Sequence, residues 1–149
     1  MAKRDPKVVT EIMKRVRSQD TKPERRFRSA LWEKGVRFRK NDPSILGKPD
    51  LSIKKLKLAV FVDGDFWHGN QYRLRGYKSL SRQFDKIESK TYWTEKIKRN
   101  RARDRKVKNS LEKEGWVVIR FWESELDSDF KGCVKKTLST ISRLRRRNR

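Results

Sequence analysis

Cysteine, long apolar runs and a leader sequence are scarce or absent in this chain, and each absence excludes a class of protein. Cys133 is the only cysteine, which excludes an intramolecular disulfide and a zinc site built on several cysteines. No apolar run approaches the roughly 20 residues that cross a bilayer. No apolar segment typical of a secretory signal follows the first residues. We therefore expect a cytoplasmic protein without a membrane partner.

Acidic and apolar residues are also few in this chain. Asp and Glu number 19 against 42 Lys and Arg, so the formal net charge is +23, and apolar residues make up 34% of the chain. Such a charge destabilises a compact protein by self-repulsion and is tolerated best beside a polyanion. Nucleic acid is the leading partner, because neutralising phosphates releases counterions. An anionic membrane would need a basic helix with a bulky apolar face, which the basic end of this chain lacks.

The organisation of the chain is that of one small domain. Its 149 residues are enough for a modest core, and neither an internal repeat nor a long linker interrupts them. We predict one domain over residues 1–149, with a basic C-terminal tail at about 143–149 and no small-molecule substrate. On charge alone, a passive basic protein such as a ribosome-associated one is an alternative.

The hydrophobic pattern predicts alternating helices and strands. Helices are expected after Asp5-Pro6, between Thr21 and Gly35, from about Trp93 to Gly115, and from Phe130 to Ile141. Strands are expected over residues 49–53, 58–63 and 116–121. This order predicts an α/β domain with a central mixed sheet flanked by helices on both faces.

Three local features add detail to this outline. Thr21 is expected to cap the second helix, with Glu24 in the capping-box position. Residues 58–63 are almost continuously apolar, which is typical of a central strand buried on both faces. Residues 65–91 show poor periodicity, and we interpret them as a substrate-facing loop.

The residues that suggest chemistry follow two adjacent strands. Asp50 begins one predicted strand and Asp63 ends the next, and these two ends lie side by side in an antiparallel hairpin. Their carboxylates suit a hard divalent ion such as Mg²⁺, and the main-chain carbonyl of Val62 offers a further oxygen. Such an ion neutralises charge and activates water in phosphodiester hydrolysis. Lysines nearby, Lys48 among them, can meet phosphate.

His68 is the only histidine in the chain. Histidine titrates near neutral pH, so His68 is the candidate general base, or the acid at the leaving group. A lone histidine is more often structural, and Asp63-Gly64-Asp65 is also compatible with an ordinary turn. The combination of these residues with Asp50 on a basic background favours a nuclease site.

Longer motifs resemble the very-short-patch mismatch-repair (Vsr) endonuclease family, part of the PD-(D/E)xK nuclease group, over about residues 15–123. The matching segments are Gln19-Asp20-Thr21 with Glu24, Gly47-Lys48-Pro49-Asp50, Phe61 through His68, Trp93-Thr94-Glu95-Lys96-Ile97 with Asn100 and Arg103-Asp104-Arg105, and Gly115-Trp116 through Trp122-Glu123. Gly-any-Phe-Trp-His followed by Trp-any-Glu-Lys-Ile is the specific part. The resemblance implies a restriction-endonuclease-like core. It also implies an endonuclease, dependent on Mg²⁺ or Mn²⁺, that nicks one strand of duplex DNA at a T:G mismatch.

The resemblance also implies roles for single residues. Asp50 matches an invariant metal-binding aspartate, the Val62 carbonyl matches a main-chain metal ligand, and His68 matches the catalytic histidine. Glu24 matches a glutamate that helps to order metal-bound water, which is compatible with its capping role. The implied products are a 5′-phosphate and a 3′-hydroxyl.

Three aromatic residues, Phe66, Trp67 and Trp93, match a wedge that enters DNA beside the mismatch. Apolar insertion unstacks and kinks a duplex, and weak pairing lowers the cost of unstacking. Core packing is the alternative. For Trp93 the two interpretations are almost equally favoured, whereas the flanking glycines favour DNA contact for Phe66 and Trp67.

This chain departs from the family pattern in two ways. The family often has a second histidine where this chain has Asp63, which can bind metal directly. The family's structural zinc ligands are cysteines and a histidine. At those positions this chain carries Asp65, Asn70, Tyr72 and Ser124. We therefore expect no structural zinc, and the loop must be held in another way, for example by Asp65 pairing with Arg73 or Arg75, which are also candidate DNA contacts.

The divergent loop leaves two alternatives to mismatch repair open. One is a nickase of a restriction or phage-defence system that needs no mismatch. The other is a non-catalytic nucleic-acid-binding protein. The implied partner is double-stranded DNA at the bacterial nucleoid, with mismatch-repair factors or a cognate cytosine methyltransferase as candidate protein partners.

Overall fold

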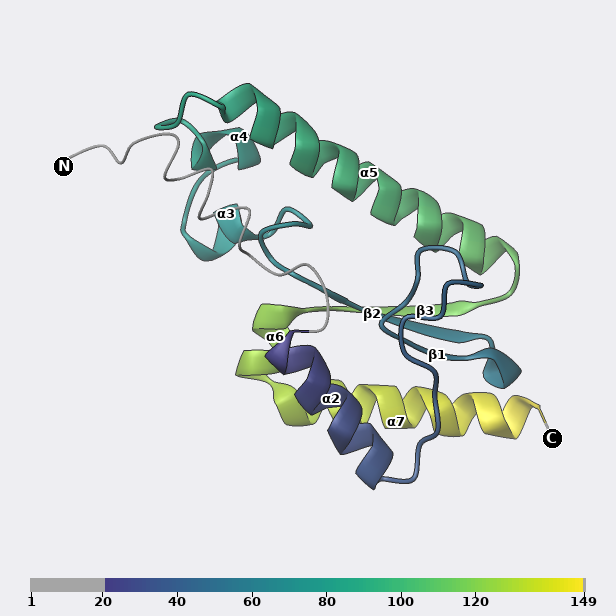
Figure 1. The fold of residues 1–149 in the computed structure, drawn as a ribbon. Coiled ribbons are helices and arrows are strands. Elements are labelled where there is room, and N and C mark those ends of the chain that lie inside the picture. Colours follow the sequence, from purple (N-terminus) through teal and green to yellow (C-terminus); the bar gives the residue numbers. More distant parts are fainter. Residues whose placement is uncertain (1–20, 149) are drawn as a thin grey trace.

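A three-stranded mixed sheet lies between two layers of helices (Figure 1). The computed structural model describes residues 21–148. β1 (Leu51–Ile53) pairs antiparallel with β2 (Leu58–Asp63), which pairs in parallel with β3 (Val117–Trp122). Helix α5 (Lys90–Lys113) covers one face of the sheet, and α2 (Lys22–Glu33) and α7 (Phe130–Arg147) cover the other.

The α/β class, the mixed sheet and the helices on both faces are therefore confirmed. The shorter elements are η1 (Lys54–Leu56), α3 (Gln71–Leu74), α4 (Leu80–Gln83) and α6 (Glu123–Ser128). The helix expected after Asp5-Pro6 lies outside the described residues. No helix within residues 21–148 combines the length and the apolar character needed to cross a bilayer.

Strand β2 is buried along its whole length, as its apolar run predicts. Val60 and Val62 belong to the large core beneath α2 and α7, whereas Ala59 and Phe61 pack with residues of α5. Side chains alternate between the faces of a strand, so Asp63 continues the set that faces α5. The strand thereby delivers a carboxylate to the space between the sheet and α5.

The segment between β2 and α5 is more ordered than the predicted loop. It contains α3 and α4, and Leu80 and Phe84 of this segment are buried. They form an apolar cluster with Phe66 and with Trp93 and Ile97 of α5. Apolar residues spaced too irregularly for a long helix still pack here against the first half of α5.

The basic C-terminal segment continues α7. The helix extends to Arg147, and Leu144 within the arginine-rich stretch is buried beside Ile141 in the large core. The residues predicted as a tail are thus helical over most of their length. Packing of one apolar side chain holds this highly charged turn against the fold.

Candidate active site

A pocket of about 430 Å³ lies between the ends of β1 and β2 and the middle of α5. Asp50, Asp63 and His68 all line it, and Lys48 lies exposed at its wall. The other lining residues are Asn41, Gly47, Phe61, Val62, Asn100, Arg103, Asp104, Val107 and Arg120. Asp50, the end of β2 and His68 thus line one pocket, and the shared cation expected between them stays a prediction.

Asp50 is held by the neighbouring strand. Its Oδ2 accepts a hydrogen bond from the Val62 N–H at 2.6 Å. Burial raises the pKa of Asp50 to about 6, and the charge of Asp63 adds to the rise, whereas hydrogen bonds with Val62 and Glu24 oppose it. A positive charge placed beside Asp50 would favour its ionised form.

Glu24 lies inside the fold, with 1% of its surface exposed. Its carboxyl group is hydrogen-bonded to Asp50, and its Oε2 lies 3.5 Å from Nη1 of Arg28. The Thr21 side chain makes no capping hydrogen bond to α2. Thr21 is the N-cap residue of α2, as predicted, but the predicted capping box is not formed, and the Glu24 carboxyl turns inward to charged and polar groups.

Asp63 is paired with an arginine from β3. Nη1 of Arg120 donates to both Asp63 oxygens at 2.9 Å, and the guanidinium carbon lies 4.1 Å from the centroid of the Phe61 ring. Burial raises the pKa of Asp63, although the charges of His68 and Arg120 oppose this. Since both oxygens already have a partner, direct metal binding by Asp63 stays a prediction.

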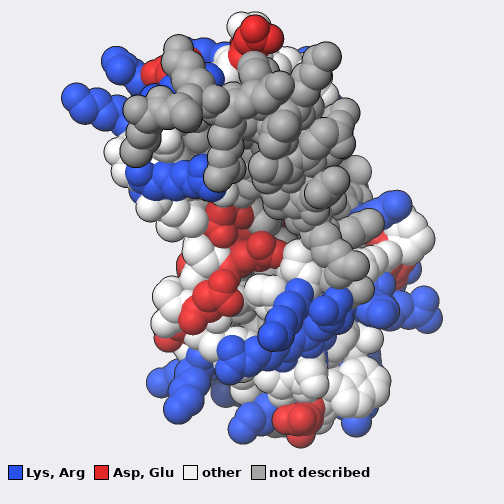
Figure 2. All heavy atoms as spheres, turned by 60° about the vertical axis from the view of Figure 1, so that its left-hand side comes forward, with Lys and Arg blue, Asp and Glu red and all other residues white. Residues whose placement is uncertain are grey.

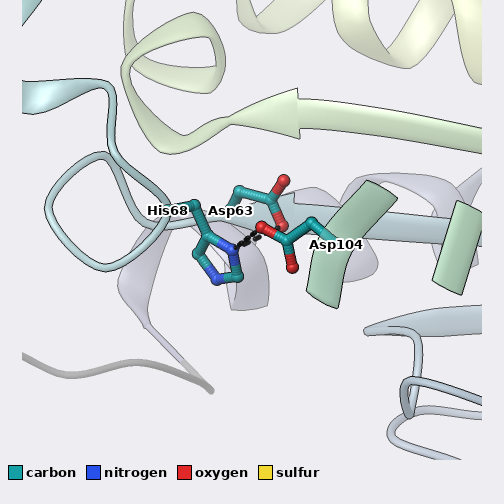
Figure 3. A group of neighbouring side chains, drawn as sticks. All are labelled: Asp63, His68 and Asp104. Atoms are coloured by element: carbon teal, nitrogen blue, oxygen red, sulfur yellow. Dashed lines mark hydrogen bonds and ion pairs between the residues drawn. The ribbon is translucent and has the colours of Figure 1, made fainter. Parts of the chain in front are cut away.

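One ring nitrogen of His68 faces the carboxylates of both Asp63 and Asp104 (Figure 3). Its Nδ1 is 2.5 Å from Oδ2 of Asp104 and 3.8 Å from Oδ1 of Asp63. Burial lowers the pKa of His68, but the hydrogen bond to Asp104 and the charges of both aspartates outweigh it, so the pKa is raised. With Nδ1 engaged by Asp104, Nε2 is the nitrogen left for proton exchange with a substrate.

The loop that carries His68 is held at its base by Asp65. The Asp65 carboxylate accepts hydrogen bonds from the Asn70 amide at 2.8 Å and from the Ser124 hydroxyl and N–H at 2.8 and 3.0 Å. The suggested pairing of Asp65 with Arg73 or Arg75 is wrong. We call Asp65, Asn70 and Ser124 the loop clamp, because it ties the start of this segment to the start of α6.

The same loop also rests directly on α5. The Asn100 amide donates to the Trp67 carbonyl at 2.9 Å. Gly69 has a φ of +82°, and a Cβ there would lie 2.5 Å from Cδ of Arg101. Glycine thus provides both the left-handed backbone and the close approach that bring His68 next to Asp104.

The predicted aromatic wedge is mostly inside the protein. Phe66 is 6% exposed and Trp93 1% exposed, and their ring centroids are 5.7 Å apart. Trp67 is half-buried beside them, with Nζ of Lys96 5.6 Å from its ring centroid. Core packing therefore describes Phe66 and Trp93 in this conformation, contrary to the preference for DNA contact at Phe66. Insertion into DNA stays a prediction, and it requires this cluster to open.

The predicted basic contacts are divided between two places. Lys48 lines the pocket, whereas Arg73 and Arg75 are exposed on and just after α3 and do not line it. Arg73 donates from Nε to the Tyr72 hydroxyl at 3.0 Å. Of the three predicted contacts, Lys48 alone lines the pocket, where Arg103 and Arg120 are the other basic residues.

Sequence reasoning did not assign Asp104 and Arg120 to the site. Both had a visible signal. Asp104 and Asn100 interrupt the apolar face of the α5 pattern, and Arg120 interrupts the apolar run of β3. A charged residue in an otherwise buried stripe requires a partner, and here the partners are His68 and Asp63.

The residues around Asp50 fit the divalent cation that the family resemblance implies. The partly buried Asp50 is hydrogen-bonded to the buried Glu24, and hard cations prefer such carboxylate oxygens as ligands. Among the described residues, Asp63, His68 and Asp104 also offer ligand atoms within 4.8 Å of one another. The carboxylates of this second group, Asp63 and Asp104, already pair with the positive charge of Arg120. Asp50 is therefore the better candidate ligand for a metal ion.

Comparisons with known proteins find similarity to DNA mismatch and DNA-nicking endonucleases. The sequence pattern of the family described as DNA mismatch endonuclease Vsr matches residues 1–74. The chain is 39% identical to the type II nicking enzyme V.NmeDIP of Neisseria meningitidis serogroup C, covering 91% of this chain and 87% of that protein. It is 44% identical to the type II nicking enzyme V.HpaIIP of Haemophilus parainfluenzae, covering 74% and 73%. It is 32% identical to the DNA mismatch endonuclease Vsr of Escherichia coli K12, covering 76% and 68%.

Proposed function

The chain belongs to the Vsr family and is a DNA-nicking endonuclease, and from this premise we propose that it hydrolyses one strand of duplex DNA in the pocket lined by Asp50 and His68. The observation that carries the proposal is that Asp50, which is hydrogen-bonded to the buried Glu24, lines the same pocket as a carboxylate-bound imidazole. The expected products are a 5′-phosphate and a 3′-hydroxyl.

We assign a divalent cation, Mg²⁺ or Mn²⁺, to Asp50 with the Val62 carbonyl, and Glu24 to the ordering of water beside it. When bound, the cation neutralises charge on the reacting phosphate and lowers the pKa of water. Asp50 is pre-positioned by its hydrogen bond from Val62. Its raised pKa of about 6 reflects a buried carboxyl with too little nearby positive charge, which a cation would supply.

His68 exchanges a proton with the attacking water or with the departing 3′ oxygen. Asp104 accepts from Nδ1, which sets the tautomer and the plane of the ring and leaves Nε2 as the reactive nitrogen. Asp104 is thus a positioning residue. The same arrangement, a carboxylate behind a histidine, orients the base in other hydrolases.

Arg120 favours the ionised form of Asp63 and orients this carboxylate beside His68. The two Arg120–Asp63 hydrogen bonds and the stacking on Phe61 fix the guanidinium at the floor of the pocket. A fixed positive charge there balances the carboxylates around the imidazole. Asp63 therefore acts on His68 through its charge, and its direct binding of metal is the less supported of its two proposed roles.

Duplex DNA is held mainly by phosphate contacts from the large basic excess. The net charge of +23 is not spread evenly. Figure 2 shows a face on which acidic side chains run through the middle with basic side chains above and below them. Lys48 at the pocket, Arg73, Arg75 and the basic end of α7 are the proposed phosphate contacts.

The finer structural assignments follow the same premise. We propose that the mixed sheet with its flanking helices is a PD-(D/E)xK core, with Asp50 and Asp63 at its two acidic positions. Residues 1–149 would form one endonuclease domain acting on DNA in the bacterial cytoplasm. Phe66, Trp67 and Trp93 would contact a mismatched base step only after the aromatic cluster rearranges.

The preferred substrate is a T:G mismatch, as expected for very-short-patch repair. The relatives named as type II nicking enzymes support a second candidate, a nickase that accompanies a restriction system and needs no mismatch. Mismatch-repair factors and a cognate cytosine methyltransferase are the proposed protein partners in the first case.

A nicking assay on end-labelled T:G and T:A duplexes tests both candidates. Wild type should produce a single nicked strand with Mg²⁺ and none with EDTA, and Asp50→Ala should be at least about 100-fold slower. Asp127→Ala, which removes an exposed carboxylate from α6, is the matched control and should nick at the wild-type rate. Equal product in Mg²⁺ and EDTA would refute the metal assignment. Equal rates on the two duplexes would favour the nickase.

A further inference from the structure

A second cavity lies on the opposite layer of the fold, as an open groove of about 670 Å³ between α2 and α7. The active-site pocket lies between the sheet and α5, whereas the groove is lined by residues of the two helices that cover the other face and by Lys34, the C-cap of α2. No residue lines both. The groove and the active-site pocket are therefore separate sites, and Arg146 on the rim also belongs to the basic end of α7 that is a proposed phosphate contact.

The floor of the groove is apolar. Its apolar lining residues are Ala30, Phe130, Val134 and Leu138. Phe130 and Leu138 are only partly buried at the edge of the large core. The Arg26 guanidinium covers the Phe130 ring at 3.9 Å, which leaves the rest of the floor open. An occupant must bring apolar side chains to be stabilised there.

The rim of the groove is basic. Lys34, Lys131, Lys135 and Arg146 line it, and none of the ten lining residues is acidic. Lys131, Lys135, Ser139, Ser142 and Arg146 recur at helical spacing along α7. Fifteen residues separate the first from the last, a length of about 22 Å at 1.5 Å per residue. The groove thus matches about four turns of a second helix.

From this geometry we propose that the groove docks an acidic amphipathic segment of a different protein. Its apolar side chains would pack on Val134 and Leu138, and its carboxylates would meet Lys34, Lys131 and Lys135. Helix-in-groove binding of this kind places apolar anchors at helical spacing and opposite charges at the rim. The proposal does not rest on the reaction assigned to the active site.

Other occupants fit this surface less well. Duplex DNA would satisfy the rim but offers a charged backbone to an apolar floor. Residues 1–20 contain six Lys and Arg against three Asp and Glu, so they carry the same sign of charge as the rim. A second copy of the chain brings a net charge of +23 to a basic surface. Charge complementarity therefore selects an acidic partner.

Fluorescence anisotropy with the full-length protein tests this proposal. The probe is a labelled amphipathic peptide of about 18 residues, five turns of helix, with leucines on one face and glutamates beside them. A matched peptide carries lysine in place of each glutamate. We expect saturable binding of the glutamate peptide and no saturable binding of the lysine peptide.

Two groove variants and one control variant complete the test. Lys131→Glu with Lys135→Glu, and separately Leu138→Asp, should each weaken peptide binding about tenfold or more while nicking is retained. Lys106→Glu with Lys113→Glu makes the same change in net charge on exposed positions of α5 and should leave peptide binding within about twofold. Circular dichroism confirms that each variant is folded, and the double charge reversal stays informative if Leu138→Asp does not fold.

Several outcomes would overturn the proposal. It fails if the glutamate peptide does not bind, if the lysine peptide binds equally, or if the control pair weakens binding as much as the groove pair. Displacement of the peptide by a duplex oligonucleotide, with the loss dependent on Lys131 and Lys135, would assign the groove to DNA. A wild-type dimer that Leu138→Asp dissociates in sedimentation would assign it to a second copy.

Discussion

The two faces of the sheet meet opposite physical demands. On the α2 and α7 side, apolar residues such as Val60, Ile119 and Ile141 form one continuous core. On the α5 side, the apolar contacts end at Asp63, and the space beyond it holds buried charges that pair with one another. Burying charge costs free energy unless each charge is paired. The α2 and α7 face therefore stabilises the fold. The α5 face is less stabilising, because it buries the charged groups that form the candidate active site.

The largest effect on stability is expected on the α7 face. Ile141→Ala should lower the free energy of unfolding by about 2–5 kcal/mol, because it leaves a cavity in the large core. Nicking per folded molecule should be unchanged, since Ile141 does not line the active-site pocket. Urea unfolding followed by circular dichroism measures the loss. Arg145→Ala, on the exposed side of the same helix, is the control and should change the free energy of unfolding by less than about 0.5 kcal/mol. An equal loss of stability in the Ile141 and Arg145 variants would contradict the proposed difference between the two faces of the sheet.

On the α5 face, a substitution is expected to reduce the nicking rate rather than the stability of the fold. Asp104→Asn should slow nicking about 100-fold, roughly 2.7 kcal/mol, because an amide can present N–H to Nδ1 and stabilise the wrong tautomer of His68. Single-turnover nicking rates on the intact T:G duplex over a range of pH measure this effect and should show a shifted pH profile. Asp127→Asn provides the control at an exposed carboxylate. An unchanged profile for Asp104→Asn would remove its positioning role.

The free energy of unfolding is expected to depend on pH through the carboxyl group of Asp50. Its folded-state pKa of about 6 lies above the ordinary 3.8, so the folded protein binds the proton more tightly than the unfolded chain. The free energy of unfolding should therefore fall as pH rises from about 4 to about 6, by on the order of 2 kcal/mol. Asp50→Asn should remove this fall and be the more stable protein above pH 6 in EDTA. A difference between the two proteins that stays constant with pH would contradict the assignment.

The smallest effect is expected at the loop clamp. Ser124→Ala removes the hydroxyl that donates to Asp65 and should lower the free energy of unfolding by about 1 kcal/mol. Since the clamp holds the base of the His68 loop, the nicking rate at saturating DNA should fall severalfold with little change in KM. Ser128→Ala, at an exposed position of α6, is the control and should alter neither quantity. A change in KM alone would show that the clamp serves DNA binding and not the placement of His68.

Much of the fold could be predicted from the sequence because the patterns that specify it are local. The apolar run of β2 predicted a fully buried strand, and helical spacing predicted α2, α5 and the body of α7. Asp50 and Asp63 were expected together because only a short hairpin separates them. These inferences need only the period of a strand or helix and the reach of a tight turn.

The rest of the site could not be predicted in this way because its contacts are distant in the chain. His68 and Asp104 are 36 residues apart, and Asp63 and Arg120 are 57 apart. Their spacing in the sequence carries no information about their distance in space. Glu24 was expected at a helix cap for the same reason, since the capping pattern is local and its contact with Asp50 is not.

By itself, the sequence determined the alternation of helices and strands, the basic surface and the types of residue available for nuclease chemistry. Only the tertiary structure decided which charges are paired, which aromatic residues are buried, and which residues hold the loop that carries His68. The physical reason is that burial and pairing depend on which segments the fold brings together. An ionisable or aromatic side chain therefore acquires its role from neighbours that its own stretch of sequence does not contain.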